Sequence, residues 1–140
     1  LFSTLPRYRS MKEDIKEYQQ ILDDVKEERH NVYLCIEYEL SVLASLVRNT
    51  CIMLSYLNNR FDFSRNQVVK YCINRYQIDV SLEEYKALYQ YRSYETGKIQ
   101  EVVKGKIDDI NKWVKVEKQL LDIAEKEVYD YEKKFDSGVE

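Results

Sequence analysis

The chain has 140 residues, of which 44% are hydrophobic and 34% charged, so it suits one folded domain with a real core and excludes wholesale disorder. Its formal net charge of −3 argues against nucleic-acid binding by bulk charge. The longest apolar stretch, Val42 to Leu57, is interrupted by Arg48, Asn49 and Thr50 and falls short of the roughly 18–20 residues that cross a bilayer.

The first residues, Leu-Phe-Ser-Thr-Leu-Pro, lack the charged and long apolar regions of a signal peptide, and they lack an initiator Met. We therefore expect a cytoplasmic protein without membrane contacts, and we expect the chain to be a fragment or excised domain of a longer one. Residues 1–9 are expected to form an extension and residues 10–138 one domain.

Helices are predicted over most of this domain. Turn-forming residues are scarce: the chain has three Gly and one Pro, none of them between Arg7 and Thr96, which disfavours a β-protein. Helix starts are predicted by Ser-x-x-Glu or Ser-x-x-Gln capping boxes, in which a Ser side chain caps a backbone N–H and the Glu or Gln reaches back. These boxes begin at Ser10, Ser64 and Ser81.

The first two predicted helices differ in their apolar pattern. The first has a single apolar stripe and breaks near His30–Asn31. Its stripe consists of Met11, Ile15, Tyr18, Leu22 and Val25. The second runs from Tyr33 to Leu57, ends at Asn58–Asn59, and is apolar on several faces, so we expect it near the centre of the bundle.

Three more helices complete the prediction. A linker, Arg60–Phe63, leads to a third helix of about three turns, and a fourth begins at Leu82 and stops before Gly97. The last and longest runs from about Lys98 to Phe135. The expected fold is an all-α, antiparallel bundle of about five helices, with two long antiparallel members and the shorter helices packed across them.

The three cysteines, Cys35, Cys51 and Cys72, are odd in number, far apart and surrounded by apolar residues. This pattern predicts buried free thiols in a reducing compartment. With one histidine, His30, and no Cys-x-x-Cys pair, we expect no metal site and no other cofactor. No Ser-His-Asp, Cys-His or phosphate-loop pattern indicates a catalytic centre in this chain.

Two carboxylates, Glu37 and Glu39, stand inside the largely apolar second helix. One interpretation places them on a narrow polar stripe with Ser41 and Ser45. The other places a partly buried carboxylate at a cleft, where desolvation would raise its pKa. They are the weak catalytic candidates of this sequence.

Arg48-Asn49 also lies among apolar residues, and this segment resembles the HEPN group of helical ribonucleases, in which a catalytic Arg is followed four to six residues later by His. Here those positions hold Ile52, Met53 and Leu54, so the general base is missing and ribonuclease activity is disfavoured. We expect Arg48 to pair with a buried acid or to line a polar cleft.

A basic and aromatic segment follows the second helix. Residues 60–75 contain four cations (Arg60, Arg65, Lys70 and Arg75) and one acid, and Tyr91 and Arg92 lie beyond it. Tyrosines at helical spacing are ordinarily at the edge of a core, with the hydroxyl reaching water. The alternative is a surface that binds a ligand or a protein.

One longer pattern runs through residues 40–115: Ile52–Arg60, a Ser-capped short helix at Phe63-Ser64, Ile78–Tyr85, Tyr91–Gly97, and Lys106–Trp113. It resembles the helical C-terminal domain of aminoglycoside nucleotidyltransferases of the kanamycin type. In that family the helical domain binds substrate beside a separate α/β domain, whose Gly-Ser and paired Asp residues hold the metal and the nucleoside triphosphate. A carboxylate of the helical domain can accept the proton of the substrate hydroxyl.

The resemblance implies a substrate-binding or partner-binding domain that is not catalytic alone and works with a nucleotidyltransferase catalytic domain in cis or in trans. The alternative is a non-catalytic interaction or dimerisation bundle, including an inactive HEPN-like regulator of a toxin–antitoxin pair. In either case we predict a cleft between the second helix and residues 60–94. Its candidate residues are Glu37, Arg48, Arg60, Arg65, Tyr91 and Arg92.

Overall fold

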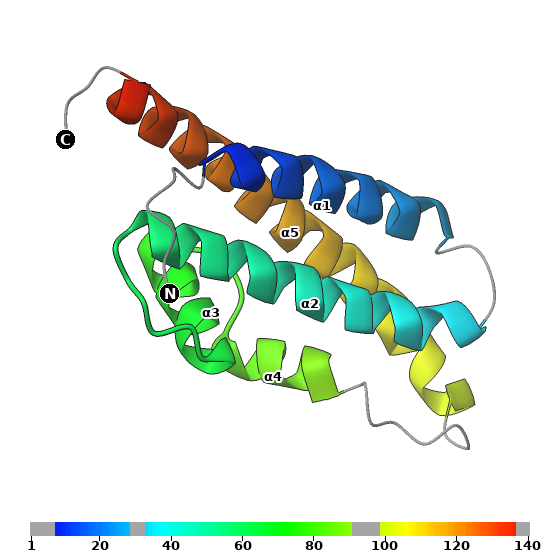
Figure 1. Ribbon diagram of the computed structural model, residues 1–140. Coiled ribbons are helices and arrows are strands. Elements are labelled where there is room, and N and C mark those ends of the chain that lie inside the picture. The colour runs from blue at the N-terminus through cyan, green and yellow to red at the C-terminus, as the bar shows by residue number, and fades with distance from the viewer. Residues whose placement is uncertain (1–7, 29–32, 91–98, 137–140) are drawn as a thin grey trace.

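The computed structural model describes residues 8–28, 33–90 and 99–136 (Figure 1). The described residues form helices and no strand, so the predicted all-α bundle with two long helices is confirmed. In chain order the helices are α1 (Tyr8–Glu28), α2 (Tyr33–Leu57), α3 (Arg65–Tyr76), α4 (Leu82–Gln90) and α5 (Ile99–Asp136). The predicted break at His30–Asn31 and the stop at Gly97 lie outside the described residues.

Helix α1 runs antiparallel to α5. The amide of Gln19 donates to Glu125 across 3.1 Å, and further along α5 Glu132 forms an ion pair with Lys12, nearer the start of α1. Figure 1 shows α1 lying along α2 and α5 and running against both. The antiparallel arrangement is therefore correct for α1.

The two longest helices, α2 and α5, instead run in the same direction, so the prediction that they are antiparallel is wrong. Thr50 pairs with Glu117, and Asn58, just after α2, pairs with Glu127, later in α5. The reason lies in the short helices between them: α3 and α4 carry the chain back toward the start of α2, and α5 therefore sets out from the same end (Figure 1).

The core lies where the apolar stripes of the helices meet α2. From α1 it takes Met11, Ile15, Leu22 and Val25, as predicted, and from α3 it takes Val68, Val69 and Cys72. Tyr85 of α4 is fully buried and contacts both α2 and α5. Its hydroxyl donates to the Ala44 carbonyl oxygen (3.1 Å), and its ring meets the edge of Trp113 at 6.0 Å.

Helix α2 is apolar on most faces because α1, α3, α4 and α5 all pack on it. Its segment Glu39–Leu57 is long and apolar enough, by length and composition, to cross a membrane, so the expectation that no stretch reaches that length is wrong. Central helices of bundles pass the same test, and 56% of this segment is buried in the bundle.

The three capping boxes behave differently. Ser81 and Glu84 form the complete box: the Ser81 hydroxyl accepts from the Glu84 N–H, and the Glu84 carboxylate accepts from the Ser81 N–H, each across 3.0 Å. Ser64 is the N-cap of α3 as predicted, but its side chain makes no capping hydrogen bond. The start predicted at Ser10 is wrong, since α1 begins at Tyr8 and Ser10 lies within it.

Candidate functional site

Of the predicted site residues whose side chains the structure describes, Arg48, Arg60 and Arg65 do not line a common pocket. Arg60 is exposed and lines a cavity, whereas Arg65 is half-buried at the start of α3 and does not line it. Tyr91, Arg92 and the side chain of Glu37 lie outside the described residues. A pocket described below does border the end of α2 and residues 60–75, and of the predicted residues Arg60 lines it.

Arg48 pairs with no acid among the described residues, so the expected ion pair with a buried carboxylate is absent there. One guanidinium nitrogen, Nη2, donates to the side-chain oxygen of Asn49 across 3.2 Å, and the buried Nε has no hydrogen-bond partner. This bond engages the side-chain amide of Asn49, which lines the pocket between α1 and α2 described below.

Glu39 is fully buried in α2, so it does not lie on a solvent-facing polar stripe. It lines neither of the two pockets described below, so its predicted place at a cleft stays a prediction. A second carboxylate, Glu117 of α5, is also fully buried, and it is not among the candidates predicted from the sequence. The Thr50 hydroxyl donates to Glu117 Oε2 across 2.9 Å, while Glu117 Oε1 has no hydrogen-bond partner among the described residues. Burial raises the pKa of Glu117 to about 8, and the bond from Thr50 opposes that shift.

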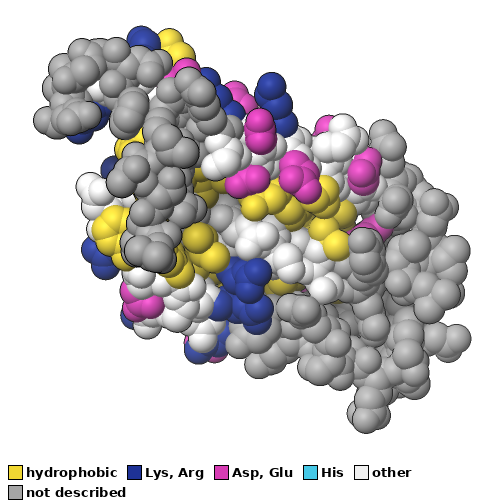
Figure 2. Space-filling model, in the orientation of Figure 1, with side chains coloured by type: hydrophobic (Ala, Val, Ile, Leu, Met, Phe, Trp, Pro, Cys, Tyr) yellow, Lys and Arg dark blue, Asp and Glu magenta, His cyan; other side chains and the backbone are white. Residues whose placement is uncertain are grey.

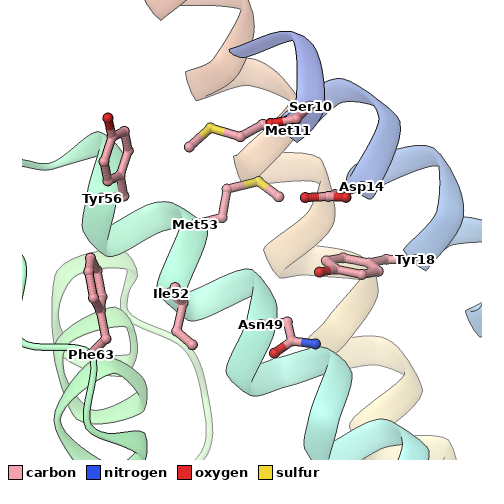
Figure 3. A pocket seen from close by; sticks show the side chains of 9 residues that line it. All are labelled: Ser10, Met11, Asp14, Tyr18, Asn49, Ile52, Met53, Tyr56 and Phe63. Carbon is pink, nitrogen blue, oxygen red and sulfur yellow. The ribbon is translucent and has the colours of Figure 1, made fainter. Parts of the chain in front are cut away.

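A pocket of about 350 Å³ opens between α1 and α2, and we call it the α1–α2 pocket (Figure 3). Figure 3 shows the polar side chains coming from both helices and Phe63 closing one end from the segment before α3. The polar lining residues are Ser10, Asp14, Tyr18 and Asn49. The apolar lining residues are Met11, Ile52, Met53, Tyr56 and Phe63.

The charged side chain that lines this pocket is the carboxylate of Asp14. Desolvation raises the pKa of Asp14, and the neighbouring Glu17 and Glu13 raise it further. The pKa of Tyr18 is raised by burial and then by Asp14, Glu17 and Glu117, while a hydrogen bond with Asn49 lowers it. In Figure 2 acidic side chains gather along α1, above hydrophobic side chains between α1 and α2. A cation entering here would relieve this crowding of negative charge.

A second pocket, of about 400 Å³, lies where the end of α2 meets the Arg60 segment and α3, and we call it the α2–α3 pocket. Three cations line it: Arg60, Lys70 and Arg75. The other lining residues are Ser55, Asp62, Gln67, Tyr71 and Asn74. In the described part of the chain α1 and α3 pack on α2 and not on each other, so the two pockets use different faces of α2.

Side-chain hydrogen bonds fix the end of α2 against α3 and α5. The Asn58 amide donates to the Leu54 carbonyl oxygen (2.6 Å), to the Tyr76 hydroxyl (2.8 Å) and to Glu127 (3.2 Å). The Tyr76 hydroxyl donates in turn to Glu127, and burial with this bond raises the pKa of Tyr76. Asn59 then takes a left-handed conformation (φ 59°) that turns the chain toward Arg60.

Two cysteines lie deep in the bundle, away from either pocket lining. Cys51 and Cys72 are buried free thiols, as predicted, and the Cys72 Sγ contacts the Cys51 carbonyl oxygen at 3.7 Å. The side chain of Cys35 lies outside the described residues. Within the part of the chain that the structure describes, no three His, Cys, Asp or Glu side chains come together as a metal site.

Comparison with known proteins adds no relative: no family model, no curated protein and no solved structure matches this chain.

Proposed function

We propose that this chain is a helical binding domain that works beside a nucleotidyltransferase catalytic domain, in the same polypeptide or in a separate one. In this proposal the α1–α2 pocket takes a small amphipathic molecule that carries a positive charge. The main observation behind this proposal is the composition of the pocket, in which Asp14, Tyr18 and Asn49 share a cavity of about 350 Å³ with a mostly apolar wall.

The lining chemistry supports an amine as the charged group. A carboxylate in a partly desolvated pocket forms a strong charge-assisted hydrogen bond with an ammonium, and Tyr18 and Asn49 add neutral polar partners. The rings of Tyr56 and Phe63 offer apolar faces to the rest of the ligand and to its charge. Since the pKa of Asp14 is raised, amine binding should weaken as the pH falls through that raised pKa and Asp14 becomes neutral.

Two model ligands of the same shape test this pocket: 2-phenylethylamine and its neutral counterpart 2-phenylethanol. We expect the amine to bind more tightly by nuclear magnetic resonance titration at pH 7, with shifts along the facing parts of α1 and α2. Asp14→Asn should weaken amine binding about tenfold or more, because it removes one charge-assisted bond, and should leave the alcohol unaffected.

Glu13→Gln is the matched control, because Glu13 is an exposed acid beside Asp14 that does not line the pocket. It should retain most of the amine affinity. Equal binding of the amine and the alcohol, or an equal loss in both variants, would show that the pocket does not select a cation.

The link to nucleotidyl transfer rests on the resemblance of residues 40–115, and it has its own test. We expect the residues encoded before Leu1, or a polypeptide that co-purifies with the natural protein, to carry a Gly-Ser segment and paired Asp residues. The 140-residue chain alone should not transfer nucleotides from a triphosphate in the presence of magnesium. If neither source holds such a segment, the nucleotidyltransferase part is refuted, whatever the outcome at the pocket.

One observation favours the rival function of a protein-docking or dimerisation module. Phe61 is 56% exposed, and its ring meets Tyr56 at 5.7 Å and Phe63 at 6.2 Å, so an exposed aromatic group borders the α1–α2 pocket. Sedimentation analysis of the chain and of Phe61→Ser decides this point. A dimer that Phe61→Ser dissociates would favour the docking function.

A further inference from the structure

We propose that the α2–α3 pocket is a binding site for a phosphate or phosphate-monoester dianion. It is separate from the amine pocket proposed above and does not depend on it. The inference rests on three features of the described residues: an excess of cations without ion pairs, a buried hydroxyl without a partner, and neutral donors around both.

The cations outnumber the acids in this pocket. Arg60, Lys70 and Arg75 face one carboxylate, that of Asp62. Asp62 already accepts a hydrogen bond from the Ser64 N–H across 3.2 Å, ahead of α3. Among the described residues none of the three cations forms an ion pair, so the pocket holds three positive charges against the one negative charge of Asp62.

Aromatic rings, rather than carboxylates, hold the two guanidinium groups. Arg60 lies over the ring of Tyr71 at 4.5 Å, and Arg75 lies over the ring of Tyr76 at 5.1 Å. A cation–π contact uses the flat face of a guanidinium and leaves the N–H groups at its edge available. Tyr71 itself lines the α2–α3 pocket, so its ring holds the Arg60 guanidinium there with the donors available for an oxyanion. Tyr76 and Arg75 also line a neighbouring cavity with Glu127, so Arg75 stands between the two cavities.

The pocket also contains a polar group that the fold itself does not use. Ser55 lines the pocket, is buried in α2 at 1% exposure, and its hydroxyl has no hydrogen-bond partner among the described residues. A buried hydroxyl without a partner destabilises the folded state, because it has lost its bonds to water and gained none in return. An occupant that accepts a hydrogen bond from this hydroxyl would remove this penalty.

The set of donors fits a tetrahedral dianion better than a carboxylate. The donor groups of the lining residues are the guanidinium of Arg60, that of Arg75 at the edge shared with the neighbouring cavity, one ammonium, one hydroxyl and the amides of Gln67 and Asn74. A phosphate offers more acceptor oxygens and more charge than the two oxygens of a carboxylate, and arginine forks match its geometry. The volume of about 400 Å³ leaves room for the organic part of a small phosphate ester.

The test is a nuclear magnetic resonance titration of the whole chain with inorganic phosphate and with phenyl phosphate. Chloride replaces phosphate in a reference titration at the same ionic strength. Both phosphates should shift the amides of Ser55 and of residues 60–75. If only inorganic phosphate binds, the pocket is a site for the phosphate ion. If phenyl phosphate binds more tightly, the pocket is a site for a phosphate monoester.

Two variants are expected to weaken phosphate binding about tenfold or more: Lys70→Gln, which removes a charged donor, and Ser55→Ala, which removes the buried hydroxyl. Ser55→Ala should fold normally, because its hydroxyl supports no hydrogen bond among the described residues. Arg65→Gln is the control, since it removes the same charge from the same helix and does not line the pocket.

Three results would overturn the proposal. The first is that phosphate produces no saturable shifts beyond those caused by chloride. The second is that Arg65→Gln weakens phosphate binding as much as Lys70→Gln, since that would indicate attraction to a basic face rather than a built site. The third is that Ser55→Ala leaves the affinity unchanged.

Discussion

The buried carboxyl of Glu117 should make the stability of this protein fall as the pH rises. Its pKa is 4.5 in an ordinary environment and about 8 in the folded chain, because burial opposes the charged form. Between these values the unfolded chain has lost the proton and the folded chain still holds it. The folded state therefore binds more protons there, and the free energy of unfolding decreases with increasing pH.

The size of the effect follows from the same two values. At about 1.4 kcal/mol per pH unit, the interval from 4.5 to about 8 corresponds to about 5 kcal/mol, of which about 3 kcal/mol is lost by pH 7. The contribution of Glu117 is complete below pH 4.5 and is exhausted above about pH 8. For a domain of this size such a loss is a large part of the total stability.

Urea unfolding of the wild type and of Glu117→Gln, from pH 5 to pH 8.5, measures this contribution. The Gln side chain does not titrate, and its oxygen can accept the bond from Thr50. The variant should therefore gain stability relative to the wild type as the pH rises, by several kcal/mol over this range. Glu125→Gln, an exposed change on the same helix, should follow the wild type. Parallel curves for the wild type and Glu117→Gln would refute the reasoning.

Local contacts support three further predictions. Ser81→Ala should lower the free energy of unfolding by about 1 kcal/mol, whereas Ser64→Ala should have little effect, because only Ser81 caps through its side chain; urea unfolding compares the two. Tyr85→Phe should cost about 1 kcal/mol by the same measurement without displacing α4, since it removes the hydroxyl that donates to the Ala44 carbonyl oxygen and keeps the buried ring. The thiols of Cys51 and Cys72 should react slowly with Ellman's reagent in the native protein and completely in urea, and rapid native labelling of both would contradict their burial.

Helix type and extent are largely predictable from this sequence, because they depend on local signals. Asn58–Asn59 marks the end of α2, and the box at Ser81 marks the start of α4. The start of α1 is not predicted correctly, because a capping box raises the probability of a helix start but does not exclude extension by two residues in front of it. The relative direction of α2 and α5 is set by how α3 and α4 turn the chain, which is a tertiary effect.

The candidate site is harder to predict, and Glu117 shows why. On α5 the apolar stripe runs through Val114 and Leu121, and Glu117 stands three residues after the first and four before the second. That spacing puts a carboxylate on the buried face, so the signal is present in the sequence. Its partner, Thr50 on another helix, cannot be found in this way, because pairing between helices leaves no trace in a single sequence.

Polar residues in the most apolar helix give the clearest account of what α2 does. The packed faces of a core helix are ordinarily apolar, and a polar side chain on such a face ordinarily makes a hydrogen bond. Each polar side chain of α2 can therefore be asked which group it binds. Thr50 has a partner inside the fold, since its hydroxyl donates a hydrogen bond to Glu117. Asn49 and Ser55 are different, because each lines a pocket, one facing α1 and the other facing α3. Asn49 is engaged by Arg48 and Tyr18, whereas the Ser55 hydroxyl has no partner among the described residues. Stability alone would favour Ala at position 55, and so the retained hydroxyl is the strongest single sign that the α2–α3 pocket is built for a ligand.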